Sequence, residues 1–381
     1  MAFFKPFALE RFFAEHEFSA RCLLSSSDCE TMSTRELLAL EPGAEERYLS
    51  LRLGYTETRG DPALRAALAA LYAGIGPESL IVHAGAEEAV LDLCLALLSP
   101  GDHVIVNFPC YQSLAEVPRA LGCAVDPWPL REAGDGKAGR RWAFDLDLLA
   151  RLLEARTKLV ILNAPHNPTG ALPTREEYDE IVALCRKAGA LFFSDEVYRD
   201  LERDPGRRLP AACEAYEDGI SLGVLSKSAG LPGLRIGWLA TRRGDILDAV
   251  ASVKDYGTIC SSGPSELLAG VAARHLGELV ARSRAIIDAN LSLVEAFFAR
   301  RPGFASWTAP EGGSTGFPRL GGGEGGFADA EALARQLVAE AGVMILPGSC
   351  YGYDRSYFRL GFGRASLSEA LDAWLDRRKN E

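Results

Sequence analysis

The sequence predicts an α/β protein that has a mainly parallel sheet in a large domain and a second, smaller α+β domain. Between residues 55 and 241, apolar segments of strand length alternate with helical segments, which is typical of consecutive βαβ units. The C-terminal third follows another pattern, in which long helical segments flank short apolar runs. We therefore expect a large domain over residues 46–260 and a small C-terminal domain over residues 261–381.

Three segments of the large domain carry clear helix signals. Asp61 and Pro62 supply an N-cap and a first-turn proline for a helix over residues 61–73. Residues 86–98 are mostly apolar and predict a buried helix. Residues 174–189 begin with a Thr cap and an acidic first turn and end at a glycine, so they predict a third helix.

Short apolar runs between these helices predict the strands of the sheet. The run over residues 158–165 is nearly continuous, as expected for a strand that is covered on both faces. The other predicted strands of the large domain lie at 81–85, 100–109, 190–198, 219–227 and 234–241. In the C-terminal third we expect helices at about 264–301 and 328–341, and short strands near 314–320, 343–346 and 357–361.

Residues 1–45 are expected to form an N-terminal arm and part of the small domain. The opening MAFFKPFALERFFAEHE interrupts its apolar residues with charged ones, so it predicts an amphipathic helix or docking arm and not a signal peptide. Residues 134–139 and the run GGGEGG at 321–326 predict loops. GGGEGG matches Gly-x-Gly-x-x-Gly, but it lies late in the chain and outside a βαβ unit, so it does not indicate a dinucleotide site.

The composition argues against several classes of function. The 381 residues include 41 Lys and Arg against 52 Asp and Glu, a formal charge of −11, so nucleic acid is not expected as a partner. The nine cysteines are odd in number and include no Cys-x-x-Cys pair, which argues against disulfides and a structural metal site and favours a cytoplasmic location. The apolar stretch at 89–98 contains Asp92 and is too short to span a membrane, so we expect no membrane partner.

Lys227 is the first candidate for chemistry, because it directly follows an apolar strand segment. Burial disfavours the charged form of an amine, and a neutral amine can condense with an aldehyde to a Schiff base. A lysine at a strand end can also extend its ammonium group to solvent, so Lys227 alone does not decide between these roles.

Asp195 is the second candidate, at the end of the apolar segment ALFFSD. A buried carboxylate requires a cationic partner, and a protonated pyridine nitrogen would be one. At about 4 Å and an effective dielectric constant near 20, their attraction is roughly 4 kcal/mol, which keeps a pyridine protonated at neutral pH. The alternative roles of Asp195 are a helix cap and an ion pair with a nearby arginine.

Other residues fit the ring and the phosphate of such a cofactor. Tyr198 and Asn167, the latter in the rigid turn PHNPTG, can hydrogen-bond a ring hydroxyl, and Tyr111 can stack on a ring. Arg235 can bind a phosphate with two hydrogen bonds. The backbone N–H groups at a helix start can hold the same phosphate; here these belong to Gly85, Ala86 and Glu87.

These segments resemble the class I/II aminotransferases, the fold type I enzymes that use pyridoxal 5′-phosphate (PLP). The resemblance covers nearly the whole chain, and eight motifs in the right order make it specific. The motifs are YTETRGDPALR (55–65), GAEEA (85–89), PGDHVIV (100–106), FPCYQS (108–113), APHNPTG (164–170), SDEVY (194–198), SKSAGLPGLRIGW (226–238) and YFRLGFG (357–363).

The resemblance implies a mainly parallel, seven-stranded-type sheet in a large PLP-binding domain, and it assigns roles to the candidates. Lys227 would form the Schiff base with PLP and serve as general base, and Asp195 would pair with the pyridine nitrogen. Tyr198 and Asn167 would bind the ring oxygen, and Tyr111 would stack on the ring. The phosphate would be held at the helix start by Gly85, Ala86 and Glu87, together with Arg235.

The phosphate site departs from the family pattern at Val224, where relatives usually have Ser or Gly. Ser226 or Ser228 could supply the missing hydrogen bond. Tyr55 matches a tyrosine that reaches the phosphate of the neighbouring subunit, which implies a homodimer with shared active sites. Arg359 matches the arginine that binds the substrate α-carboxylate.

The implied activity is transfer of the amino group of an L-amino acid to a 2-oxo acid, with Arg359 and Asn167 holding the carboxylate. The opening ERFFAEHEFSAR and the stretch LLSSSDCETMS (23–33) are similar to capreomycidine synthase-like members, which cyclise an arginine derivative by elimination and re-addition. Asp28 or Glu30 could bind a cationic substrate side chain there, and the alternative is a capped helix start. Transamination, elimination, cyclisation and oxidation begin with the same carbanion, so the scaffold does not separate them.

Two other classes of function fit the sequence less well. If the chain were a non-catalytic α/β protein, the presence of all six candidate side chains would be a coincidence. These are Lys227, Asp195, Tyr198, Asn167, Arg235 and Arg359. A ligand-sensing regulator would need a DNA-binding segment, for which this acidic chain leaves no room.

Overall fold

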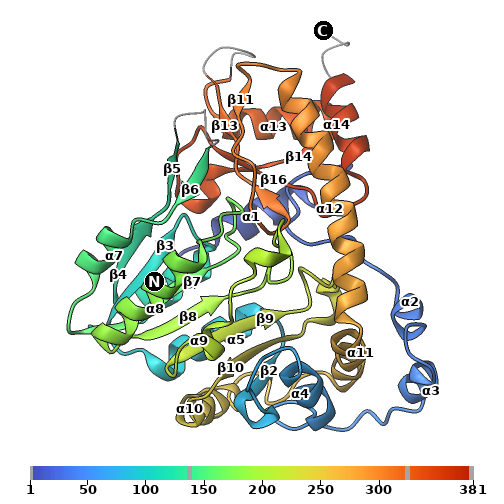
Figure 1. The fold of residues 1–381 in the computed structure, drawn as a ribbon. Coiled ribbons are helices and arrows are strands. Elements are labelled where there is room, and N and C mark those ends of the chain that lie inside the picture. Colours follow the sequence, from blue (N-terminus) through green and yellow to red (C-terminus); the bar gives the residue numbers. More distant parts are fainter. Residues whose placement is uncertain (1–2, 135–139, 322–326, 377–381) are drawn as a thin grey trace.

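The computed structural model describes residues 3–134, 140–321 and 327–376. Its centre is the predicted α/β sheet, which has seven strands in the order β2-β10-β9-β8-β7-β3-β4 (Figure 1). The strands are β2 (Leu80–His83), β10 (Gly237–Thr241), β9 (Gly219–Val224), β8 (Leu191–Asp195), β7 (Thr157–Asn163), β3 (His103–Phe108) and β4 (Ala124–Pro129). β10 is antiparallel to both of its neighbours, and every other pair is parallel.

Helices cover this sheet, and their ends follow the sequence signals. α5 (Ala86–Leu97) packs on β2, β9 and β10 and contacts α6 (Gln112–Ala120) and α10 (Gly244–Lys254). α8 (Arg175–Ala188) starts at a capping box between Thr174 and Glu177. The remaining helices of this part are α4 (Pro62–Ala69), α7 (Leu146–Leu152), α9 (Ala212–Ala215) and α11 (Gly263–Arg274).

The C-terminal third forms a separate α+β layer (Figure 1). Its helices are α12 (Leu276–Ala299), α13 (Ala330–Ala341) and α14 (Leu367–Asp376). Its strands are β11 (Ala305–Ser306), β12 (Thr315–Gly316), β13 (Arg319–Leu320), β14 (Val343–Met344), β15 (Leu346–Pro347) and β16 (Phe358–Gly361). The N-terminal strand β1 (Cys22–Leu23) pairs with β14, so this strand belongs to the layer, whereas residues 6–8 contact Gln112 of α6 in the large domain.

Several boundaries differ from the sequence predictions. The helical region expected at about 264–301 consists of two helices, α11 and α12, which meet at His275, two residues before Gly277. The strand expected at 219–227 ends at Val224, because its pairing with β10 stops there, and Lys227 lies in the turn that follows.

Other elements were not predicted, or lie where the structure gives no description. Among the described residues, the sequence did not predict the helices α2 (Thr34–Leu38), α3 (Ala44–Leu49), α6, α7, α9, α10 and α14, or the strands β1, β4, β5 (Arg131–Ala133), β6 (Arg141–Ala143) and β11. The N-terminal helix was expected and is α1 (Ala8–His16). Most of the two predicted loops, at 135–139 and 322–326, falls outside the described residues. Across the described ranges, no helix is both long and apolar enough to cross a bilayer.

The segment over residues 24–30 lies directly on β16. Gly361 N–H donates to the Leu24 carbonyl oxygen at 2.6 Å, and Glu30 N–H donates to Gly363 at 2.8 Å. A Cβ atom at Gly361 would overlap the Ser26 carbonyl oxygen. Glycine is therefore required for this close approach.

We expect Gly361→Ala to lower the free energy of unfolding by about 1–3 kcal/mol, because the new methyl group forces the backbone of Ser26 away. Urea unfolding measures this. Gly277→Ala in α12 is the matched control, because a Cβ atom there meets nothing within 4 Å, and it should leave stability equal or higher. Equal effects of the two substitutions would contradict the close packing.

Candidate active site

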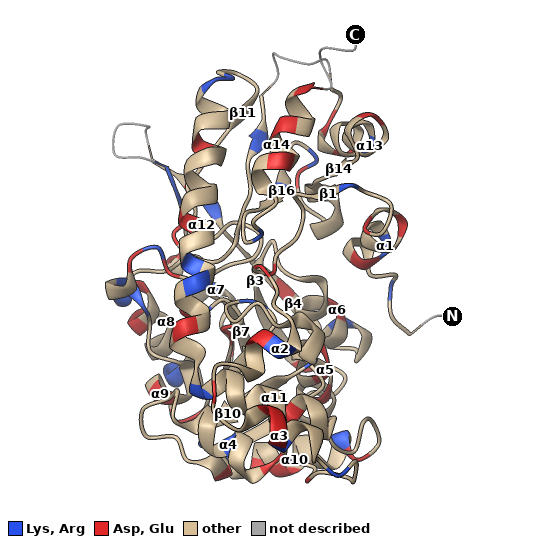
Figure 2. Cartoon of the chain, turned by 90° about the vertical axis from the view of Figure 1, so that its right-hand side faces the viewer, with Lys and Arg blue, Asp and Glu red and all other residues tan. Residues whose placement is uncertain are grey.

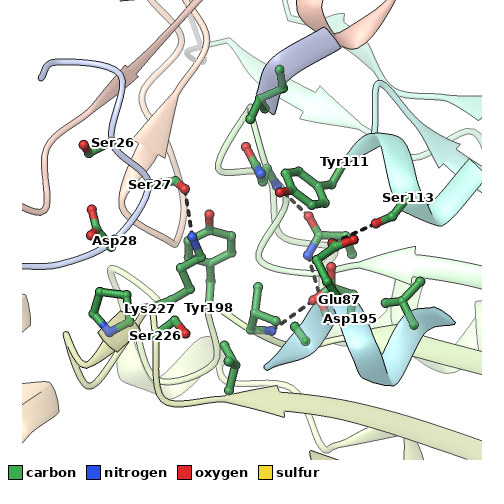
Figure 3. A pocket seen from close by; sticks show the side chains of 18 of the residues that line it. Ser26, Ser27, Asp28, Glu87, Tyr111, Ser113, Asp195, Tyr198, Ser226 and Lys227 are labelled. Carbon is green, nitrogen blue, oxygen red and sulfur yellow. Dashed lines mark hydrogen bonds between the residues drawn. The ribbon is translucent and has the colours of Figure 1, made fainter. Parts of the chain in front are cut away.

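A cavity of about 340 Å³ lies at the carboxyl ends of the central strands (Figure 3). Asn163 from β7, Asp195 from β8 and Val224 just at the end of β9 line it, together with the first turn of α5. The carboxyl edge of an open parallel sheet is where such folds bind ligands. The volume is in the range of small-molecule sites.

Lys227 projects into this cavity from the turn after β9 (Figure 3). Its Nζ donates to Ser27 Oγ at 2.9 Å and lies 5.9 Å from the centre of the Tyr198 ring. Burial lowers the pKa of the Lys227 ammonium group, while Asp28 acts in the opposite direction. The amine therefore loses its proton more readily than a surface lysine, as the sequence predicted.

Asp195 lies at the base of the cavity (Figure 3). One carboxyl oxygen accepts a hydrogen bond from Val197 N–H at 3.2 Å, and no salt bridge to Asp195 is found in the described part of the chain. Burial raises the pKa of the Asp195 carboxyl to about 7, and Glu87 contributes in the same direction. The ion pair with an arginine, one alternative from the sequence, is therefore absent among the described residues.

Arg359 and Asn167 meet on the wall of the cavity that β16 provides. Asn167 Oδ1 accepts hydrogen bonds from Arg359 Nη1 at 3.2 Å and from Tyr351 Oη at 2.9 Å. Arg359 is 1% exposed, and Nε and Nη2 donate to the Ser25 carbonyl oxygen at 3.1 and 2.5 Å. Within the described residues no carboxylate pairs with this guanidinium. A buried cation without a counter-charge calls for an anionic ligand.

Tyr198 and Tyr111 contribute their rings and hydroxyl groups. Tyr198 Oη is buried and forms no hydrogen bond of ordinary geometry in the described structure, although the nearby Ser27 side chain acts against the rise of the Tyr198 pKa that burial causes. Tyr111 packs against Phe7, with ring centres 5.0 Å apart, and its Oη donates to Glu10 Oε1 at 2.7 Å. Through these contacts α1 lies beside the cavity, and Glu10 and Glu17 line it.

At the far end of the cavity, Arg235 lies beside the start of α5. Gly85 is the N-cap of α5 at φ 95°, and a Cβ atom on it would lie 2.5 Å from Arg235 Nη2. A Cβ atom on Gly237 would lie 2.9 Å from Ala86 N. Glycines thus leave a cradle between a guanidinium and the free N–H groups of a helix start, which suits a phosphate.

Four further predicted residues lie in different places. Ser226 lines this cavity together with Val224, whereas Ser228 lines a separate one. Asp28 lines the cavity, but its carboxylate accepts hydrogen bonds from Arg364 Nε at 3.1 Å and Nη2 at 2.9 Å. Tyr55 is 93% exposed and is not among the residues that line the cavity of its own chain.

The structure also adds residues that the sequence did not indicate. The Glu87 side chain faces the cavity, accepts from Ser113 Oγ at 2.9 Å, and has a pKa raised by burial to about 7. The sequence predicts a role only for the backbone N–H of Glu87. Ser27 accepts from Lys227, and Tyr351 donates to Asn167 and accepts from Arg359 Nη1 at 2.6 Å. The bonds to Lys227 and Asn167 span distant parts of the chain, so no local pattern could have shown them.

Comparison with known proteins agrees with this geometry. The family model for aminotransferase class I and II matches residues 23–373. Capreomycidine synthase of Streptomyces vinaceus is 34% identical over 381 aligned residues, which cover 95% of this chain and 93% of that protein.

Solved structures agree as well. A PLP-dependent aminotransferase from Streptococcus suis 89-1591 is 32% identical with a TM-score of 0.90, covering 99% of this chain and 98% of that one. The PLP-dependent cyclase OrfR is 29% identical with a TM-score of 0.88, with the same coverage. The sheet, the cavity and these similarities lead to one conclusion: the chain belongs to the class I and II aminotransferase family.

Proposed function

We propose that this protein is a PLP-dependent aminotransferase that moves the amino group of an L-amino acid to a 2-oxo acid. The observation that carries the proposal is that one cavity contains both the desolvated amine of Lys227 and the buried, carboxylate-free guanidinium of Arg359. An amine of this kind reacts with aldehydes, and a guanidinium of this kind binds carboxylates. Family membership and the PLP-dependent structural relatives imply PLP as the cofactor.

The residues of the cavity fit PLP on three independent observations. The Tyr198 hydroxyl forms no hydrogen bond with the described residues and can donate to a ring oxygen. The Asp195 carboxyl, buried without a cation, gains one when a protonated ring nitrogen lies beside it. A Cβ atom at position 85 would fill the space beside Arg235. Because Gly85 has none, this space is open to a phosphate.

PLP supplies an aldehyde for amines and a ring that accepts electrons from the substrate. Lys227 would hold the cofactor, and its Nζ would serve as the base that takes a proton from the substrate Cα. Arg359 binds the α-carboxylate and so orients the Cα–H bond. Asp195 would keep a ring nitrogen protonated, and α1 with Tyr111 restricts water at the mouth of the cavity.

A second candidate function is elimination or cyclisation of an arginine-like amino acid. The supporting observation is the acidic character of the cavity wall, which includes Glu10 of α1, Glu17 directly after α1, and Asp28. Figure 2 shows acidic residues on α1. A guanidinium side chain would find carboxylates there, although Asp28 already pairs with Arg364. The similarity to capreomycidine synthase and to the cyclase OrfR supports the same candidate.

The active sites are proposed to be shared between two copies of the chain in the cytoplasm. Three large side chains near the start of α4 and the end of α10 are almost fully exposed, which suits an interface. These are Leu53 at 85%, Tyr55 at 93% and Tyr256 at 96%. Tyr55 would then complete the phosphate site of the partner.

The test is a half-reaction without any oxo acid. Single amino acids, arginine and hydroxylated arginine included, are added to the PLP-loaded protein, and the cofactor spectrum and product masses are followed. One equivalent of oxo acid with conversion of the cofactor to its amine form supports transamination. Many turnovers that yield a dehydrated or cyclised product while the aldehyde form persists would replace the first candidate with the second. Lys227→Ala should be inactive in both cases.

Tyr198→Phe should stabilise the cofactor-free protein by about 1 kcal/mol, because it removes a buried hydroxyl without a partner, and should weaken PLP binding. Urea unfolding and PLP titration measure the two effects. Tyr178→Phe is the matched control, because Tyr178 Oη is also buried without a partner in the described structure but lies outside the cavity. It should stabilise the protein and leave PLP affinity unchanged. Weakened PLP binding in both variants would contradict the role of Tyr198.

The cofactor-free protein should lose stability as the pH rises from about 4 to 7. The folded pKa of Asp195 is about 7 against 3.8 for an ordinary Asp, so the folded state holds a proton that the unfolded state releases. Asp195→Asn should match the wild type at pH 4 and be more stable at pH 8, by up to about 4 kcal/mol.

Asp92→Asn is the control for this pH effect, because burial also raises the pKa of Asp92 to about 7 at a site away from the cavity. Both variants should flatten the pH profile of urea unfolding. PLP should reverse the advantage of Asp195→Asn and leave that of Asp92→Asn. If PLP reverses the stability advantage of neither variant, Asp195 does not belong to the cofactor site.

Arg359→Ala should raise KM for amino acids about 10- to 100-fold, the loss of one charge-assisted pair, and change KM for amines without a carboxylate far less. Steady-state kinetics with both substrate types measures this. Arg359→Lys keeps the charge, so its KM for amino acids should lie between those of the wild type and Arg359→Ala. Equal losses for both substrate types would show that Arg359 acts only on the structure of the cavity.

A further inference from the structure

Lys254 is a buried lysine outside the cavity and without a role in the proposed reaction. It is the last residue of α10 and is 0% exposed. Its Nζ donates to the carbonyl oxygens of Thr58 at 2.7 Å and Val82 at 2.8 Å. A buried ammonium group of this kind is costly unless its hydrogen bonds are well formed, so the two carbonyls are held firmly.

The two carbonyls belong to segments that matter for the phosphate site. Val82 lies on β2, which leads into the cradle at Gly85. Thr58 lies in the loop over residues 51–61, which carries Tyr55 at the surface. Lys254 therefore ties the Tyr55 loop to the strand that positions the phosphate-binding end of α5.

Other contacts fix the same loop. Val82 N–H donates to the Arg59 carbonyl oxygen at 3.0 Å, and Thr56 Oγ1 donates to the Ser261 carbonyl oxygen at 3.1 Å. Gly60 has φ 103°, and a Cβ atom on it would lie 2.5 Å from Val82 Cγ2. The loop thus lies on β2 with no space for a side chain between them.

Carboxyl groups on neighbouring helices act on the pKa of Lys254. Burial lowers the pKa of Lys254, and Glu88, Glu266 and Asp92 act against this. Glu266, from α11, accepts from Asp61 N–H at 3.3 Å at the end of the loop. Glu88, from α5, accepts from Thr258 Oγ1 at 2.6 Å. The cluster joins α5, α10, α11 and the Tyr55 loop.

We propose that Lys254 is a positioning residue, which fixes the loop over residues 51–61 so that Tyr55 reaches the cofactor phosphate of a second copy of the chain. This rests on the shared sites of the proposed function. A merely structural lysine would affect stability, whereas a lysine that acts through Tyr55 also affects the cofactor affinity, and only while the Tyr55 hydroxyl is present.

The test is a double-mutant cycle on PLP affinity, with the cofactor-free dimer of each protein titrated with PLP and its mass checked by sedimentation. Tyr55→Phe and Lys254→Met should each weaken binding about tenfold or more, the loss of one hydrogen bond to a charged group. The double variant should bind about as weakly as Tyr55→Phe alone, because both changes remove the same contact.

Additive losses would overturn the proposal, since Lys254 would then act independently of Tyr55. Unchanged affinity in either single variant would also overturn it. Unchanged PLP affinity in Tyr55→Phe would not contradict the proposed aminotransferase reaction, because the half-reaction with amino acids tests that reaction separately. Lys158→Met, a lysine exposed on β7, is the matched control and should change nothing.

Two further variants guard against a misfolded Lys254→Met. Lys254→Met with Glu266→Gln removes one charge of each sign and keeps an oxygen for Asp61 N–H, so the burial of an unpaired carboxylate is avoided. Gly60→Ala displaces the same loop without touching the ammonium group. Both should show the same non-additivity with Tyr55→Phe, and additive behaviour in both would overturn the proposal.

Discussion

The structure depends on keeping three charged groups of one cavity out of water without pairing them to each other. Arg359 is buried against carbonyl and amide oxygens, Asp195 against a backbone N–H, and the Lys227 amine against a serine hydroxyl. Each arrangement leaves a charge or a polar atom unsatisfied, which is unfavourable for the empty protein. A ligand that carries a carboxylate, a pyridine and a phosphate satisfies all of them at once.

The fold brings these groups together from distant parts of the chain. The parallel strands end at one edge, which places Asp195 and the turn with Lys227 side by side. The antiparallel strand β10 returns next to β2, so that Gly237 lies against Gly85. The N-terminal segment and β16 then close the other side, where Ser25 binds Arg359.

Much of this could be predicted from the sequence, because apolar runs and helix caps are local signals. The order of strands and helices and most site residues follow from such runs and from the polar residues that end them. Tertiary partners have no local signal. The sequence could not show that Arg364 forms an ion pair with Asp28 or that Tyr351 donates a hydrogen bond to Asn167. It also could not show that β9 ends before Lys227, where its pairing with β10 stops.

The most direct measurement is to identify the lysine that binds the cofactor. The PLP-loaded protein is reduced with borohydride and digested, and the modified peptide is sequenced by mass spectrometry. We expect the added mass on the peptide that contains Lys227, because its amine is desolvated inside the cavity. A label on another lysine, such as the buried Lys254, or no label at all would contradict the assignment of this cavity as the active site.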